Sequence, residues 1–132
     1  MQRMADEFRR MLDHMTLRVR DMDASRAFYA AALAPLGYGI IAEYGGDDGI
    51  AFGPPGQDDF AIAPAGDRPA GPVHLAFYAP DRAAVGDFHV FGMSAGGRDN
   101  GPPGLRPHYH ADYYAAYLID PDGNNVEAVH HG

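Results

Sequence analysis

The fold can be recognised from one stretch, Leu12-Asp13-His14-Met15-Thr16-Leu17-Arg18-Val19, which the chain repeats. Sliding the sequence by sixty residues aligns this stretch with Pro72-Val73-His74-Leu75-Ala76-Phe77-Tyr78-Ala79. In both copies apolar and polar residues alternate, which is the period-two pattern of a half-buried strand. His14 and His74 take the same place on the polar face. The sequence therefore predicts two equivalent strands, over 13–20 and 73–79.

Each copy continues in the same order beyond this strand. Asp21 or Asp23 is placed to cap a first helix and Asp81 a second, because a side-chain oxygen there accepts an otherwise unpaired backbone N–H. Phe28 and Phe88 occupy the same place in the two helices. Short apolar segments separated by Gly, Pro and Asp then predict further strands. These strands are expected over 38–44, 49–52 and 60–63 in the first copy, and over 113–119 and 125–130 in the second.

The length of 132 residues suits a single domain, and 46% hydrophobic residues suffice for a core. We expect residues 1–11 to be an N-terminal arm or a short helix, and residues 12–132 to form the domain. Within that domain the first module spans about 12–66 and the second about 72–132.

The overall charge limits the kinds of partner. A formal net charge of -8 argues against nucleic acid and against a basic membrane-binding face. No apolar run approaches the length of a membrane span, and the first twelve residues lack the apolar stretch of a signal peptide. We therefore expect a cytoplasmic protein with a small-molecule substrate.

The residue types that are missing narrow the chemistry. The chain has no Cys, which excludes disulfides and thiolate chemistry. All ten basic residues are Arg, so a Schiff-base lysine is excluded as well. Ser25, Ser94 and Thr16 do not lie in a nucleophile-elbow pattern. The remaining inventory of seven His and many carboxylates favours a metal site or acid–base chemistry.

Three side chains form the candidate metal site. His14 and His74 hold equivalent positions, which approach each other near a pseudo-two-fold axis. Glu127 lies on the last expected strand between the small apolar residues Val126 and Ala128, so alternation turns it towards the cup between the modules. Two imidazoles and one carboxylate form a facial triad that can hold a divalent ion with open positions.

Three stretches resemble the glyoxalase/bleomycin-resistance/extradiol-dioxygenase, or vicinal oxygen chelate, superfamily. Residues 12–19 followed by Asp21 and Phe28-Tyr29 resemble the opening of its first module. His74-Leu75-Ala76-Phe77 resembles the start of its second. Residues 120–129, Asp-Pro-Asp-Gly-Asn-Asn-Val-Glu-Ala-Val, resemble its closing hairpin and are the most specific match. The resemblance covers the chain from Leu12 to its end.

The resemblance implies an α+β fold of two βαβββ modules related by pseudo-two-fold symmetry. The modules form an open cup of mixed β-sheet with the helices outside, usually in a homodimer. It also implies His14, His74 and Glu127 as ligands of one divalent metal ion, with Zn, Ni, Mn and Fe not distinguished. The place of a fourth family ligand falls on Phe60 or Ala61, neither of which binds metal. Three ligands are the pattern of extradiol dioxygenases and fosfomycin-resistance-type transferases rather than of glyoxalase I.

The expected loop over 101–114 supplies the other candidate site residues. Arg106 is a candidate clamp for a substrate carboxylate or phosphate, and His108 or His110 a candidate general base. Tyr109 and Tyr113 are further candidates for substrate contact. Tyr117 lies where a tyrosine of the extradiol enzymes donates to substrate, but no His precedes His74 where those enzymes carry their acid–base residue.

Two classes of function follow. The leading hypothesis is a glyoxalase-like, metal-dependent enzyme that binds a small oxygen-rich substrate through bidentate coordination, with isomerase, lyase or dioxygenase chemistry. The alternative is a metal-free small-molecule binding protein of the bleomycin-resistance type. A third possibility is a metal with only a structural role.

Overall fold

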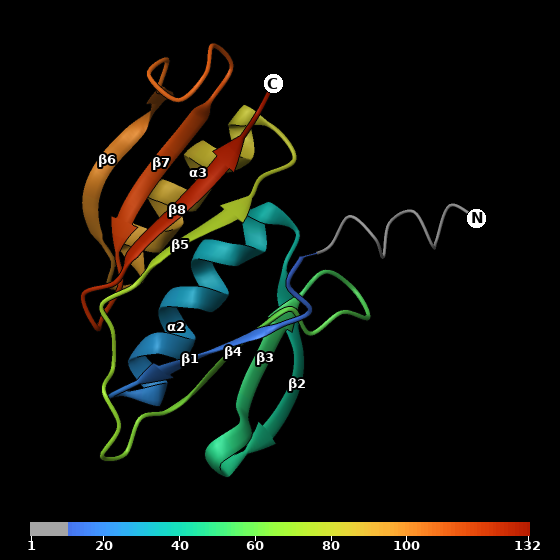
Figure 1. The fold of residues 1–132 in the computed structure, drawn as a ribbon, viewed down its shortest axis with the longest axis vertical. Coiled ribbons are helices and arrows are strands. Elements are labelled where there is room, and N and C mark those ends of the chain that lie inside the picture. Colours follow the sequence, from blue (N-terminus) through green and yellow to red (C-terminus); the bar gives the residue numbers. More distant parts are fainter. Residues whose placement is uncertain (1–10) are drawn as a thin grey trace.

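The computed structural model describes residues 11–132, so the expected N-terminal arm lies almost entirely outside the described residues. The described chain forms two halves with the same order of elements (Figure 1). The first half consists of β1 (Met15–Val19), α2 (Met22–Leu33), η1 (Ala34–Leu36), β2 (Gly39–Gly45), η2 (Gly46–Asp48), β3 (Gly49–Gly53) and β4 (Phe60–Pro64). The second half consists of β5 (His74–Tyr78), α3 (Arg82–Ser94), β6 (Arg98–Leu105), β7 (Tyr114–Ile119) and β8 (Asn125–His130). The βαβββ order predicted by the repeat and the resemblance is confirmed.

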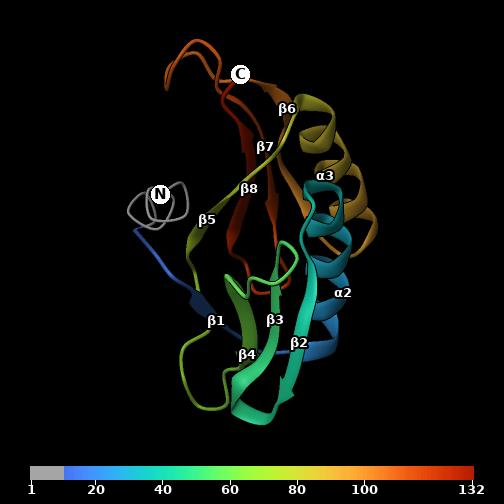
Figure 2. The same ribbon diagram turned by 90° about the vertical axis from the view of Figure 1, so that its right-hand side faces the viewer.

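Each half forms a four-stranded mixed sheet. The strand orders are β1-β4-β3-β2 and β5-β8-β7-β6. The first strand of each half runs parallel to the last, and the other pairs are antiparallel. The two helices lie together on one side of the molecule, while the sheets form the other side (Figure 2). The arrangement is an open cup with its helices outside.

The helices begin where the sequence predicts. Asp21 accepts the backbone N–H of Ala24 at 3.1 Å, and Asp81 accepts that of Ala84 at 2.8 Å. Each carboxylate therefore satisfies one of the orphan N–H groups of a first helical turn. Asp23 lies inside α2 and is not the cap. Among residues 11–132, no helix is long and apolar enough to cross a membrane.

One hydrophobic core serves both halves. Its fully buried side chains come from both helices and both sheets, and include Phe28, Phe52, Phe88, Leu118 and Val126. Because α2 and α3 pack directly on each other, the two sheets cannot separate without exposing this core. The two halves are therefore held together by this shared core.

The closing hairpin also ties the halves together through polar contacts. Tyr29 on α2 donates its hydroxyl to Asp120 at 2.5 Å, with both side chains buried. The same carboxylate accepts the backbone N–H groups of Asp122 and Asn124 and the side-chain amide of Asn124. Burial raises the pKa of Tyr29, so the phenol remains a donor. The conspicuous Asp-Pro-Asp-Gly-Asn motif thus has a structural role.

Replacing Tyr29 by phenylalanine should lower the free energy of unfolding by about 1.5–3 kcal/mol, because the buried carboxylate loses a hydrogen bond. Chemical denaturation measures this change. Tyr44→Phe is the matched control, since Tyr44 donates to Asp58 at 2.9 Å on the exposed surface. That control should change stability by less than about 0.5 kcal/mol. Equal stability of the two variants would contradict a role for the Tyr29–Asp120 bond.

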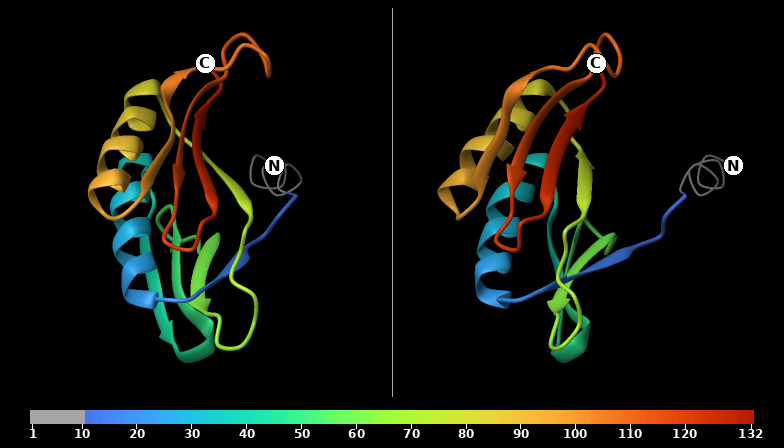
Figure 3. Two further views of the ribbon diagram at one scale, coloured as in Figure 1. Left: turned by 90° about the vertical axis from the view of Figure 1, so that its left-hand side faces the viewer. Right: turned by 60° about the vertical axis from the view of Figure 1, so that its left-hand side comes forward.

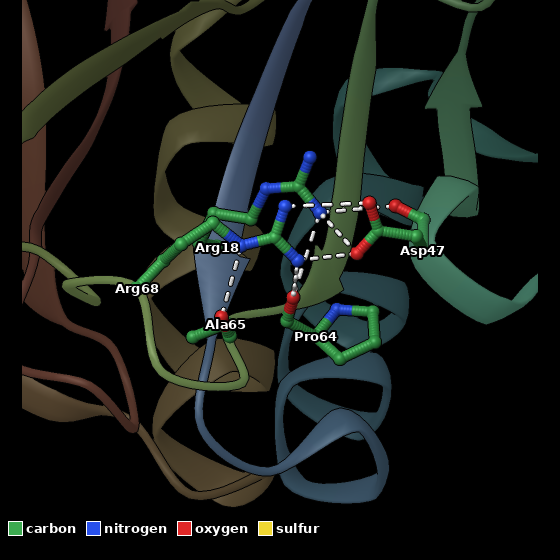
Figure 4. A network of polar contacts seen from close by, with 5 residues as sticks. All are labelled: Arg18, Asp47, Pro64, Ala65 and Arg68. Carbon is green, nitrogen blue, oxygen red and sulfur yellow. Dashed lines mark hydrogen bonds and ion pairs between the residues drawn. The ribbon is translucent and has the colours of Figure 1, made fainter.

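A second polar network fixes the tip of the β2–β3 hairpin. Figure 4 shows Arg18 of β1 and Arg68, which follows β4, with both guanidinium groups directed towards Asp47. Arg18 also donates to the backbone oxygen of Asp47 at 3.0 Å, and Arg68 to that of Ala65 at 3.0 Å. The hydrogen bond from Arg68 holds the pKa of Asp47 below its usual value. The network keeps η2 folded against the first sheet.

One expectation about local structure is wrong. The Gly/Pro-rich segment was expected to be a loop over 101–114, but residues 98–105 form β6 and only residues 106–113 form the loop. β6 tolerates Pro102 and Pro103 because it is the edge strand of its sheet, where a missing N–H leaves no partner unsatisfied. Its register with β7 shifts around Gly101 and again before Gly104.

Candidate functional site

Glu127 is the buried centre of the second half. Its side chain on β8 is 1% exposed, whereas that of His74 is 53% exposed. Strands β5 and β8 pair in parallel with Ala76 opposite Glu127, which places His74 diagonally beside it on the same face. The Nε2 atom of His74 lies 2.8 Å from the Oε1 atom of Glu127. A buried carboxylate thus faces an imidazole that is open to solvent.

Two tyrosines complete the surroundings of this carboxylate. Tyr113 donates its hydroxyl to Oε2 of Glu127, and Tyr117 lies directly opposite Glu127 on β7. Burial and the Glu127 carboxylate raise the pKa of Tyr117 to about 12. Burial and the hydrogen bond to Glu127 raise that of Tyr113. Both phenols therefore stay protonated near neutral pH, where they are hydrogen-bond donors.

His14 lies in the first half, just before β1. Its side chain is 64% exposed, and its Nδ1 atom lies 2.8 Å from Oδ1 of Asp13. This hydrogen bond raises the pKa of the imidazole. A carboxylate on Nδ1 fixes the ring orientation and leaves Nε2 as the nitrogen that can bind a ligand. His14 borders a cavity of about 260 Å³, with Thr16, Tyr44, Asp48, Ala51, Asp58 and Ala61 as its other lining residues.

A single chain does not gather the predicted triad. Among residues 11–132, no three His, Cys, Asp or Glu side chains lie close enough together to hold a metal ion. His74 and Glu127 are in contact, but His14 belongs to the cavity of the other half. The expectation that pseudo-symmetry brings the two histidines together within one chain is therefore not met.

Strand register identifies the counterpart of Glu127 in the first half. Ala76 pairs with Glu127, and its equivalent sixty residues earlier, Thr16, pairs with Ala61. Of the two residues considered from sequence, Ala61 rather than Phe60 is the counterpart. Ala61 lines the His14 cavity, whereas Phe60 is buried in the core. The place of a fourth family ligand thus holds a methyl group.

The β6–β7 loop meets the C-terminal residues at one end of the second sheet (Figure 3). His110 Nε2 lies 2.7 Å from His131 Nδ1, so His110 is engaged with another histidine rather than with Glu127. The rings of His108 and Tyr109 pack at a tilt with their centres 4.2 Å apart, and Tyr109 packs on Tyr113 at 4.8 Å. Through Tyr113 this aromatic cluster is continuous with the Glu127 site.

Arg106 begins this loop. Its Cζ atom lies 5.3 Å from the centre of the Tyr117 ring, and its Nη2 donates to the backbone oxygen of Pro102 at 2.7 Å. The ring of His74 lies 6.4 Å from that of Tyr117 on another side. The second half therefore brings together His74, Arg106, Tyr113, Tyr117 and Glu127, all of which the sequence analysis selected.

Two functional neighbours were missed from sequence. Asp13 orients His14, and the adjacent Asp-His pair in the opening stretch was the available signal. His131 was not selected, although it holds His110. No sequence pattern relates a loop histidine to one beyond the final strand, so this contact depends on the tertiary structure.

Comparisons with known proteins agree with this architecture. Residues 11–128 match the family model of the Glyoxalase/Bleomycin resistance protein/Dioxygenase superfamily. A search of curated proteins finds no match. The chain is 33% identical to a crystallised glyoxalase/bleomycin resistance protein from Albidiferax ferrireducens T118, over 93% of this chain and 100% of that chain, with a TM-score of 0.77.

Two more distant structures show the same fold. A glyoxalase-related enzyme from Fulvimarina pelagi is 19% identical over 91% of this chain and 87% of that chain, with a TM-score of 0.68. TnmS3, an antibiotic binding protein from Streptomyces sp. CB03234, is also 19% identical, over 93% of this chain and 97% of that chain, with a TM-score of 0.64.

Proposed function

Because the chain belongs to the glyoxalase/bleomycin resistance protein/dioxygenase superfamily, we propose that it is a metal-dependent enzyme of the glyoxalase-like group. In this proposal one divalent ion binds His74 and Glu127 of one chain and His14 of a second chain in a homodimer. The observation that carries the proposal is the buried Glu127 carboxylate, which faces an open imidazole across 2.8 Å.

The donor set fits a divalent ion. Imidazole nitrogens and a carboxylate oxygen suit Zn, Ni, Mn or Fe. Glu127 is held by Tyr113, and His14 by Asp13, which are the outer contacts that orient ligands. His74 and Glu127 alone are two donors, so the site needs a third.

A symmetric dimer supplies the third donor. In the proposed dimer the first half of one chain faces the second half of the other, and the two-fold axis repeats this contact. His14 then reaches a His74–Glu127 pair at two equivalent places. The exposure of His14 and of His74 in a single chain supports this arrangement, because both imidazoles are free to meet a partner.

The side chains of the site suit a small oxygen-rich substrate. A bound divalent ion supplies Lewis acidity to vicinal oxygens of the substrate. Tyr113 and Tyr117 remain protonated beside Glu127, and the hydroxyl of Tyr113 donates to its carboxylate, so both phenols line the place where the substrate would bind. His108 and His110 are the proposed general bases, since their loop carries Tyr113 into the site. Isomerase, lyase and dioxygenase chemistry all require these roles.

The second candidate is a metal-free binding protein. It is favoured by the hydrogen bonds from Tyr113 and with His74, which satisfy Glu127 without any ion. The fold similarity to TnmS3, an antibiotic binding protein, shows that the fold is compatible with such a role. A binding protein of this kind would use the cup as a cleft for an organic ligand.

Elemental analysis of protein purified without chelator separates the two candidates. We expect one transition metal per chain in the wild type and in His110→Ala, the control variant in the loop. Size-exclusion chromatography with light scattering should show a dimer. The contrary result is wild-type protein that is purified without metal and gains no ion on titration with Zn²⁺, Ni²⁺, Mn²⁺ or Fe²⁺. This result would reject the metal-dependent enzyme in favour of the metal-free binding protein.

A further inference from the structure

Within residues 11–132, Arg106 pairs with no carboxylate, although the chain has a formal net charge of -8. Four other arginines pair with carboxylates: Arg18, Arg20, Arg26 and Arg68. Among residues 11–132, the Arg106 guanidinium donates only to the backbone oxygens of Pro102 at 2.7 Å and of Leu105 at 3.4 Å. A guanidinium has five N–H groups, so three of them have no hydrogen-bond acceptor among the described residues.

The backbone of β6 is shaped around this guanidinium. A Cβ atom on Gly101 would lie 3.3 Å from Nη2 of Arg106, and one on Gly104 would lie 3.1 Å from Nη1. Gly101 also has a φ of +150°, which L side chains rarely adopt. The missing side chain at Gly101 leaves room for both the Tyr117 ring and the guanidinium, and that at Gly104 leaves room for the guanidinium, while Pro102 and Pro103 fix φ between them.

The orientation of the guanidinium relates it to the buried carboxylate. Its Cζ atom lies 5.3 Å from the centre of the Tyr117 ring, and Tyr117 is the cross-strand neighbour of Glu127. In the strand order β5-β8-β7-β6, Tyr117 on β7 lies between β5, which carries His74, and β6, which Arg106 follows. A ligand that spans Tyr117 can therefore reach Arg106 with one end and the His74–Glu127 pair with the other.

We infer that Arg106 is the anion-binding subsite of this cup, and that the substrate is a small molecule with a carboxylate or phosphate group. A guanidinium held flat binds either group through two parallel hydrogen bonds. The inference rests on the proposed function for the place of the substrate, but binding of an anion at Arg106 requires no metal. The two properties can therefore be tested separately.

Titration of chelator-treated, full-length protein with oxalate and with inorganic phosphate tests the subsite. Isothermal titration calorimetry measures the dissociation constant of each anion, and changes in NMR chemical shift report which residues it contacts. Arg106→Met should weaken the binding of the preferred anion by about tenfold or more. This is the loss of affinity expected when one charge-assisted hydrogen-bonded pair is removed. Arg106→Lys should recover part of it, because lysine keeps the charge but not the planar fork. Arg98→Met, the same change of charge at the other end of β6, is the control.

The two anions distinguish whether the anionic group of the substrate is a carboxylate or a phosphate. Binding of oxalate alone assigns a carboxylate substrate, and binding of phosphate alone assigns a phosphorylated one. Equal affinity of wild type and Arg106→Met for both anions, or no binding of either, overturns the subsite. Wild-type protein that binds an anion through Arg106 but takes up no divalent ion on titration keeps the subsite and removes the proposed metal chemistry. Protein that binds a divalent ion but binds anions equally well with and without Arg106 keeps the proposed metal site and removes the subsite.

Discussion

Glu127→Gln should lose bound metal while the fold remains. Glutamine has the same shape as glutamate but no charge, and a neutral amide is a poor ligand beside two imidazoles. We expect the affinity for a divalent ion to fall by about 100-fold or more, since loss of an outer contact alone already costs 10–100-fold. Competition with a chromogenic chelator measures this change.

The expected change in stability is small by comparison. Glu127 accepts from Tyr113 and contacts His74, and a glutamine amide keeps one acceptor while it turns the other position into a donor. One mismatched hydrogen bond should cost about 1–2 kcal/mol of unfolding free energy. Glu43→Gln is the matched control, because Glu43 pairs with Arg26 on the exposed surface. Full metal retention by Glu127→Gln would remove Glu127 from the ligand set.

The strands and helix caps could be predicted because their signals are local. Alternation places His74 on the polar face of β5, and Asp21 and Asp81 cap their helices through contacts three residues ahead. The sixty-residue repeat relates β1 to β5, so these local patterns also predict two modules with the same order of elements. It also identifies Ala61 as the counterpart of Glu127 once the strand register is known.

Other features depend on contacts between distant segments. The Gly/Pro-rich residues 98–105 do not have a strand pattern, but they pair with β7 as an edge strand. Alternation predicts the face that Glu127 occupies, not that Tyr113 from the loop donates to it. Likewise the repeat predicts that His14 and His74 are equivalent, but equivalence does not say whether they meet within a chain or between two.

Mixing two inactive variants should decide that last question. His14→Ala and His74→Ala should each lose metal when purified alone, because every composite site then lacks one imidazole. Subunit exchange between equal amounts makes about half of the dimers mixed. In each mixed dimer one site combines the intact His14 of one chain with the intact His74 and Glu127 of the other. Metal binding should therefore return to about one quarter of the wild-type level.

A double variant provides the control for the exchange. Mixed dimers of wild type with His14→Ala/His74→Ala contain no complete composite site, because each site takes one residue from the damaged chain. Exchange should thus lower the metal content from about one half to about one quarter of the wild-type level. A site within one chain predicts one half before and after exchange, and no recovery when the single variants are mixed. An unchanged metal content in the control mixture, or no recovery in the mixture of single variants, would contradict the shared site. Each chain would then form its own site, which requires β1 to move so that His14 reaches His74.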